Sequence, residues 1–222
     1  MTKPTCFMDV TIAFDNGWSA ISSLYGLIPL VFAGFLLILF FLNNRGTREL
    51  WWGSYVLIST LFCEPIKALA KQPRPPTACA TSYGMPSCHS TLCTGWLVLI
   101  TLDVATCALM SRKKSTEPST IYTAIVVLCS FLFLAPVGIA RAVSGDHSDR
   151  QVLAGTLLGI AVGGIWWGIS IPLRKMFADR IGSRVFGFLT HNYPSLGDMQ
   201  ANFEDSEKSE SLAFSAKRTQ YV

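Results

Sequence analysis

Charged side chains are scarce in this chain. Only 14% of its 222 residues are Asp, Glu, Lys or Arg and 50% are hydrophobic, whereas ordinary soluble domains carry roughly 25% charged residues. This deficit excludes an ordinary water-soluble domain. The composition is typical of a chain that lies in a lipid bilayer.

Other features are missing as well. The seven cysteines and three histidines form no cluster with the spacing of a zinc site, so we expect no metal and no other cofactor. The opening residues contain Asp9 and Asp15, and no positively charged start leads into a clean apolar core, which argues against a signal peptide. We find no internal repeat and no second folded domain. We expect no nucleic-acid partner, and the oligomeric state stays open.

What the chain does have is five apolar runs, each close to the roughly 20 residues that cross about 30 Å of hydrocarbon. A lipid-exposed backbone must satisfy its own hydrogen bonds, so all five runs are predicted to be helices. We therefore predict an all-α polytopic membrane bundle with about five transmembrane helices. The runs are Leu24–Leu42, Leu50–Ala70, Thr91–Met110, Ile121–Ala140 and Val152–Leu173.

These runs divide the chain into three parts. Residues 1–23 are predicted to form a lumenal or interfacial segment, of which residues 6–22 lie on the membrane surface as an amphipathic stretch. Residues 24–173 form the transmembrane domain. Residues 174–222 mix charges with serines and have few apolar anchors, which predicts a cytoplasmic tail. The side chains expected to face lipid in the first part are Phe7, Ile12, Phe14 and Trp18.

Lys and Arg in the connections set the orientation. Positive residues follow the first, third and fifth runs, so the positive-inside rule places these connections in the cytoplasm. The loops at the opposite face, which contain the candidate site, then face the lumen or exterior. The cytoplasmic set is Arg45, Arg48, Arg112, Lys113, Lys114, Arg174, Lys175, Arg180 and Arg184.

The loop between the second and third runs carries the first candidate site residues. Lys67 lies near the end of the second run, and Arg74 follows Pro73, which stops the helix. The third run begins just after Ser87. Its hydroxyl, together with the free N–H groups of the helix N-terminus near Cys88, can bind an anion.

The loop between the fourth and fifth runs completes the set. Arg141 offers a planar fork of donors that suits phosphate oxygens, and Gly145 allows the tight reversal that returns His147 toward it. Gln151 lies one helical turn beyond His147 and can accept its imidazole N–H. His89 is expected beside the bound group. Charged groups gathered at one membrane face predict a site for an anion, most simply a phosphate.

These residues resemble the three signatures of the type 2 phosphatidic-acid phosphatase superfamily. The family motifs read Lys-Arg-Pro, Pro-Ser-Gly-His and Ser-Arg-His-Asp, and the spacings here match across roughly residues 25–173. The matching residues are Lys67 with Arg74-Pro75, Pro86-Ser87-Cys88-His89, and Arg141 with His147.

Within that superfamily the chain is most similar to the dolichyl diphosphatase branch. The string Tyr-Gly-Met-Pro-Ser at residues 83–87, the short chain and Gln151 in place of the last Asp resemble that branch. Glucose-6-phosphatases also tolerate Gln there, but they are longer and cross the membrane more times than five spans allow.

The resemblance implies a role for each residue. His147 would attack the terminal phosphorus to form a phosphohistidine while Gln151 holds its other nitrogen. His89 would protonate the leaving oxygen and then activate water. The implied phosphate-binding residues are Lys67, Arg74, Ser87, Cys88 and Arg141.

The resemblance also implies a reaction and a location. The expected enzyme is a metal-independent phosphoric anhydride hydrolase in the endoplasmic reticulum membrane, with its site facing the lumen. It would convert dolichyl diphosphate, a polyisoprenyl diphosphate, to dolichyl phosphate and inorganic phosphate, which recycles the carrier for N-glycosylation. The alternatives are a broader lipid phosphatase, acting on phosphatidate or other isoprenoid phosphates, and a non-catalytic protein that binds a lipid phosphate.

Three departures from the family pattern bear on these alternatives. Cys88 replaces a Gly, Ala140 replaces a Ser and Gln151 replaces an Asp. Gln151 can hold the tautomer of the neighbouring histidine but cannot offset an imidazolium charge. Asp146 and Asp149 are the acids available to do so.

The cysteines inside the runs are expected to pack as small apolar side chains. Cys6 and Cys79 lie on the predicted lumenal side and are free to pair, although their spacing does not decide it. The packing set is Cys63, Cys93, Cys107 and Cys129.

Two acids lie inside predicted spans, where a charge is costly. Asp103 is too far along its helix to join the site, and we expect it to pair with Lys113 or Lys114 near the cytoplasmic end. Glu64 lies three residues before Lys67 and is expected to orient that lysine.

Overall fold

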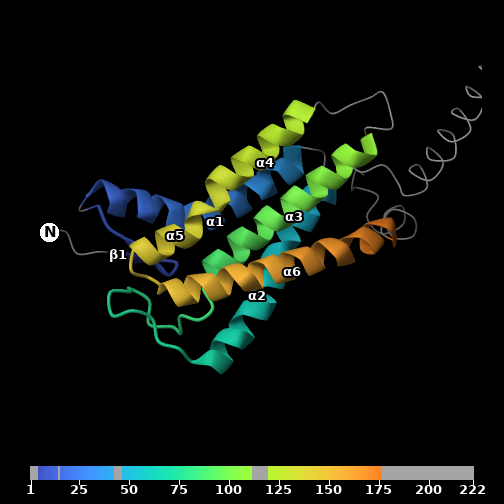
Figure 1. Cartoon of the computed structure of the whole chain (residues 1–222). Coiled ribbons are helices and arrows are strands. Elements are labelled where there is room, and N and C mark those ends of the chain that lie inside the picture. Colours follow the sequence, from blue (N-terminus) through green and yellow to red (C-terminus); the bar gives the residue numbers. More distant parts are fainter. Residues whose placement is uncertain (1–4, 15, 43–46, 112–119, 177–222) are drawn as a thin grey trace, which may run out of the picture.

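A computed structural model describes residues 5–14, 16–42, 47–111 and 120–176. Within these ranges the chain is helical except for a short hairpin and the loops, so the predicted all-α membrane bundle is confirmed (Figure 1). The hairpin consists of β1 (Thr5–Phe7) and β2 (Val10–Ile12). The helices are α1 (Gly17–Leu42), α2 (Thr47–Ala70), α3 (Cys88–Ser111), α4 (Thr120–Leu134), α5 (Pro136–Val143) and α6 (Asp149–Met176).

Four segments of the described chain are long and apolar enough to cross a membrane: Gly17–Leu42, Cys88–Thr106, Ala124–Val143 and Asp149–Leu173. The third runs through α4 and α5, which meet at Pro136. The remaining predicted span, Leu50–Ala70, corresponds to α2. That helix has 24 residues, about 36 Å at 1.5 Å per residue, but Glu64 and Lys67 make it more polar than the others.

A stripe of glycines on α6 lets it lie directly against α3. A Cβ atom added to Gly155, Gly159 or Gly163 would come within 2.4–2.7 Å of a backbone oxygen of α3 or its cap. Small residues at this four-residue spacing allow close helix approach in membranes. Because the two helices run together, the N-terminal ends of α3 and α6 meet at one end of the bundle, and the Ser87 amide donates to the Gln151 carbonyl over 3.0 Å.

The bundle centre is filled by aromatic side chains, and it explains the buried acid on α3. Trp96 is fully buried and donates from Nε1 to the Trp52 carbonyl over 2.7 Å. Trp52 in turn donates to Asp103 over 3.2 Å. The prediction for Asp103 named Lys113 and Lys114, which lie outside the described residues. Within the described residues, one contact of Asp103 therefore comes from α2.

The N-terminal segment differs from the predicted amphipathic stretch over residues 6–22. Phe7 pairs with Val10 across a two-residue turn in which Met8 and Asp9 have φ values of 47° and 65°, as tight hairpins require. Val10 is buried against α1, which begins at Gly17 rather than at residue 24. The hairpin forms because its buried strand finds a partner in the helical bundle. Phe14 and Trp18 do stay exposed, as predicted.

The predicted cytoplasmic side falls largely outside this description. Residues 43–46, 112–119 and 177–222 hold most of the Lys and Arg residues that set the orientation, together with nearly all of the predicted C-terminal tail. The described loops are therefore those of the opposite end. Figure 1 shows the hairpin, the loop between α2 and α3, and the α5–α6 junction gathered there.

Candidate active site

Lys67 and Arg74 enter the site from the end of α2. The Lys71 amide closes the last turn on the Lys67 carbonyl at 3.1 Å, and Lys71 has a positive φ of 47° that ends the helix. Lys67 is buried, and its Nζ lies 3.0 Å from Glu64 Oε1. The prediction that Glu64 orients this lysine is confirmed.

Every nitrogen of the Arg74 guanidinium has a partner. Nε and Nη2 donate to the carbonyl and hydroxyl oxygens of Ser82 at 3.1 and 3.0 Å. Nη2 also forms an ion pair of 3.0 Å with Asp9, on the hairpin turn. Nη1 lies 3.1 Å from His147 Nε2. Arg74 therefore joins the hairpin to the candidate nucleophile.

Arg141 occupies the middle of the site and is 1% exposed. Its Nη2 donates to the Asp9 carbonyl, and its Nη1 lies 2.8 Å from Asp146 Oδ2. The carboxylate lies off the N–H direction, however. Nε and Nη1 have no hydrogen-bond acceptor among the described residues. Buried donors of this kind are costly unless a bound anion satisfies them.

Asp146 neutralises Arg141 and not His147. It is fully buried and accepts hydrogen bonds from the Thr11 amide at 3.2 Å, from the Thr11 hydroxyl, and from Ser144 Oγ at 2.8 Å. Asp149 is exposed at the start of α6. The suggestion that one of these acids offsets an imidazolium charge on His147 is therefore wrong for Asp146, whose lone pairs are already committed.

The loop after α5 returns His147 to Arg141 as predicted. Gly145 has a φ of 73°, and the His147 amide donates to the Arg141 carbonyl over 3.1 Å. The imidazole Nδ1 lies 2.9 Å from the Gly84 carbonyl and 3.3 Å from Gln151 Oε1. Both neighbours are acceptors, so Nδ1 carries the proton and Nε2 keeps its lone pair.

The environment of His147 keeps its imidazole neutral. Burial, followed by the positive charges of Arg74 and Arg141, lowers the pKa of His147 to about 3. The hydrogen bonds to Gly84 and Gln151 act in the opposite direction. Since an ordinary histidine has a pKa near 6.5, the ring is neutral at neutral pH, and its Nε2 lone pair accepts a hydrogen bond from Arg74 Nη1.

Gln151 has a full set of partners that only an amide can satisfy. Its Oε1 accepts from His147 and, at 3.2 Å, from the Ser148 amide. Its Nε2 donates to the Pro73 carbonyl at 2.8 Å and to Gln72 Oε1 at 3.3 Å. A carboxylate would place an oxygen against those two acceptors. The structure thus gives a physical reason for the departure from Asp at this position.

Ser87 and Cys88 form the start of α3. Ser87 is fully buried, and its hydroxyl oxygen caps the helix by accepting from the Ser90 amide and hydroxyl at 3.5 and 3.1 Å. Cys88 is joined by a disulfide to Cys63 of α2. The prediction that Cys63 is a packing residue is therefore wrong. Adjacent helices bring two cysteines together that are 25 residues apart in sequence.

The remaining cysteines have four different outcomes. Cys6 and Cys79 form a disulfide that ties β1 to the loop after α2. Cys93 is buried and free, as predicted for packing, whereas Cys129 is free but exposed on α4. The side chain of Cys107 lies outside the described residues.

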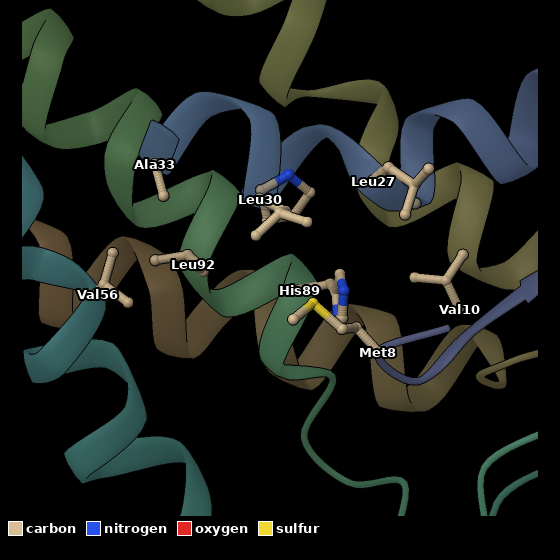
Figure 2. Close-up of a pocket in the computed structure, with 10 residues that line it drawn as sticks. Met8, Val10, Leu27, Leu30, Ala33, Val56, His89 and Leu92 are labelled. Atoms are coloured by element: carbon tan, nitrogen blue, oxygen red, sulfur yellow. The ribbon is translucent and has the colours of Figure 1, made fainter. Parts of the chain in front are cut away.

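His89 belongs to the site and also lines an apolar pocket. It lies one residue inside α3, where the positive charges of Lys67, Arg74 and Arg141 act on its ring. The ring lines the pocket shown in Figure 2 together with Met8 and Leu92. All predicted site residues therefore come from the same end of the bundle.

Sequence reasoning missed the contribution of the hairpin. Asp9 contacts both arginines and Thr11 contacts Asp146, yet neither residue belongs to a motif. The one usable signal was that Asp9 is an acid next to an apolar span. A group of three or more His, Cys, Asp or Glu side chains suited to a metal ion is absent from the described residues, and metal independence stays a prediction.

The helical bundle, with cations and imidazoles grouped at one end, has the features of a membrane phosphatase. The chain matches the PAP2 superfamily model over residues 48–174, more than half of its length, and it belongs to that superfamily. It is a multi-pass membrane protein and a hydrolase of the lipid phosphatase class.

A curated relative narrows the comparison. The chain is 27% identical over 200 residues to Dolichyldiphosphatase 1 of Dictyostelium discoideum, and the match covers 82% of this chain and 84% of the relative. No solved structure matches the chain significantly. The match to the relative extends beyond the residues that the superfamily model covers.

Proposed function

We propose that this protein hydrolyses dolichyl diphosphate to dolichyl phosphate and inorganic phosphate. The observation that carries the proposal is the state of His147, a neutral imidazole whose Nε2 faces Arg74 while Gly84 and Gln151 hold Nδ1. The substrate assignment is supported by the similarity to a dolichyldiphosphatase along most of the chain.

In the first half of the proposed reaction, the terminal phosphate displaces Asp9 from Arg74 and takes up the buried donors of Arg141. The Arg74 Nη1 donor also moves from His147 Nε2 to a phosphate oxygen, which frees the Nε2 lone pair. His147 Nε2 then attacks the terminal phosphorus, and the bond to the bridging oxygen breaks. Its electron pair leaves with dolichyl phosphate, helped by a proton from His89. The product left on the enzyme is a phosphohistidine.

In the second half, His89 takes a proton from a water molecule that attacks the phosphohistidine. Inorganic phosphate leaves and His147 returns to its neutral form. Lys67, Arg74 and Arg141 stabilise the charge on the equatorial oxygens in both steps, the role that a metal ion has in other phosphatases. Ser87 and the N–H groups near Cys88 add hydrogen bonds from the helix end.

The site is proposed to face the lumen of the endoplasmic reticulum, where dolichyl phosphate is recycled for N-glycosylation. The Cys6–Cys79 disulfide at this end supports an oxidising compartment. A cysteine introduced at Thr81, in the loop after α2, should react with impermeant thiol reagents only when the lumenal side is open. Labelling of this cysteine from the cytoplasmic side would show that the site faces the cytoplasm.

The function is tested by phosphate release from purified protein with three substrates in parallel: dolichyl diphosphate, dolichyl phosphate and phosphatidate. We expect the diphosphate to have the highest kcat/KM, and a chelator to leave it unchanged. A preference for either monophosphate would instead indicate the broader lipid phosphatase. If a chelator lowered the activity and added Mg²⁺ restored it, the metal-independent mechanism would be contradicted.

A further inference from the structure

An apolar pocket is lined in part by His89. Its volume is about 240 Å³, and its lining comes from four elements: the hairpin, α1, α2 and α3 (Figure 2). Among its ten lining residues, His89 alone has a polar side chain. The others include Met8 and Val10 of the hairpin, Leu30 and Ala33 of α1, and Leu92 of α3.

His89 lines this pocket and belongs to the candidate active site. The pocket wall reaches the site on the hairpin side too, because Met8 is followed by Asp9, which contacts Arg74 and Arg141. In the proposed reaction, His89 donates its proton at the leaving group, on which the lipid tail begins. The tail must therefore start close to this imidazole, where the apolar lining also starts.

The lining chemistry distinguishes two kinds of lipid tail. A polyprenyl chain is hydrocarbon from its first carbon, whereas a glycerolipid has two ester groups a few bonds from its phosphate. Ester carbonyls placed among these apolar side chains would lose water and find no side-chain donor except His89. A buried polar group without a partner is strongly disfavoured. The pocket thus suits the polyprenyl chain.

The size of the pocket limits how much of the tail it takes. A cavity of about 150 Å³ holds one benzene molecule, which has six carbons. By the same proportion, about 240 Å³ holds about nine or ten carbons, close to two isoprene units. The rest of a long tail would continue into the membrane.

We propose that this pocket binds the first isoprene units of the substrate and selects a polyprenyl diphosphate over a glycerolipid diphosphate. This inference rests on the proposed function, because it assumes a diphosphate at the cations. It assigns tail selection to the N-terminal hairpin and α1, outside the residues that the superfamily model matches. The hairpin wall is held in place where Val10 packs on Gly26, leaving no room for a Cβ there.

Two neighbouring residues of α1 provide a matched test. Ala33 lines the pocket, while a Cβ added at Gly34 would meet nothing within 4 Å. Ala33→Phe should lower kcat/KM for farnesyl diphosphate about ten-fold by filling the pocket. Gly34→Phe, which adds a ring of the same size outside the pocket, should leave it unchanged. Inhibition by orthovanadate, a phosphate mimic, should be the same in both variants.

Equal kcat/KM values in Ala33→Phe and Gly34→Phe would overturn the inference. Should Ala33→Phe also weaken vanadate inhibition, Leu30→Ala decides the matter, because it widens the pocket without adding atoms. We then expect a several-fold change in the preference for farnesyl diphosphate over geranyl diphosphate. An unchanged preference would again reject the pocket as the tail site.

The choice between tails is tested with headgroups held constant. Wild-type protein should hydrolyse farnesyl diphosphate with a kcat/KM at least about ten-fold above that for diacylglycerol diphosphate. Equal rates would reject tail selection and leave the diphosphatase activity intact. Failure to hydrolyse either compound would instead contradict the proposed function, so the two failures are distinguishable.

Discussion

Residues 48–174 and residues 5–42 contribute to the candidate site in different ways. The first region carries all three motifs and matches the superfamily model. The second carries no motif, yet its hairpin contacts Arg74 and Arg141 and lines the pocket beside His89. Each region would be incomplete without the other, because the arginines of one hold the carboxylate and carbonyl of the other.

The two regions differ in what they would do to a substrate: one supplies the reacting groups, and the other controls its approach to them. The candidate nucleophile, its orienting partners and the buried cations all come from residues 48–174, where their geometry depends on α2, α3, α5 and α6. Under the proposed function, the hairpin and α1 instead determine which anion reaches Arg74 and which tail lies next to His89. Substitutions in the first region should therefore affect every substrate, and those in the second should discriminate among substrates.

The largest effect is expected at His147. His147→Ala removes the group that bonds to phosphorus, and no other nucleophile lies in its place. Turnover should fall by at least about 10³-fold for all substrates. Steady-state phosphate release measures it, and thermal unfolding should show that the variant is folded. Asp149→Asn, an exposed neighbour, serves as the control. Near-normal turnover in His147→Ala would reject the assignment.

Among the candidate catalytic residues in 48–174, a substrate-dependent loss is expected at His89. A diphosphate expels a phosphate monoester that needs little protonation, whereas a monophosphate must expel an alkoxide. Proton donation contributes about 10²–10⁴-fold to the rate. His89→Ala should therefore slow the hydrolysis of dolichyl phosphate far more than that of dolichyl diphosphate. Single-turnover release of the first product isolates this step from water activation. Equal losses there would mean that His89 is not the leaving-group acid.

A smaller effect, read from pH dependence, is expected at Gln151. His147 must be neutral to attack, and its pKa of about 3 keeps it neutral well below pH 6.5. Gln151→Glu places a carboxylate near Nδ1, stabilises the imidazolium and raises that pKa by about 1–3 units. The acid limb of kcat/KM should move to higher pH by the same amount. Both proteins are measured on the same substrate, so that ionisation of the substrate affects the two pH profiles equally. If the acid limbs of the two profiles coincide, the role of His147 is contradicted.

The smallest effect is expected at Asp9, in the second region. Its side chain is 47% exposed and pairs with Arg74, so in the proposed reaction it would compete with the substrate for that arginine. Asp9→Asn removes a negative charge from the path of an anion, so KM should fall by up to about five-fold, as exposed ion pairs are weak. The gain should shrink at high salt. A rise in KM would instead show that Asp9 helps to build the site.

Much of the motif region was predictable from sequence. The apolar runs indicated the helices because a bilayer requires about 20 apolar residues and internal backbone hydrogen bonds. The short separation of His147 and Gln151 predicted their contact, since residues four apart share a helix face. Glu64 and Lys67 were predictable in the same way, and Gly145 allowed the reversal that the loop makes.

The tertiary structure alone decided the rest. Thr11 and Asp146 are 135 residues apart, and their contact depends on how the hairpin packs against α1 and the α5–α6 junction. The Cys63–Cys88 disulfide, the partners of Gln151 and the pocket beside His89 likewise join separate helices. Composition and spacing report what a chain segment does by itself or within one turn of helix. Contacts between distant segments arise only when the whole bundle buries its faces together, and here those contacts bring the hairpin to the candidate site.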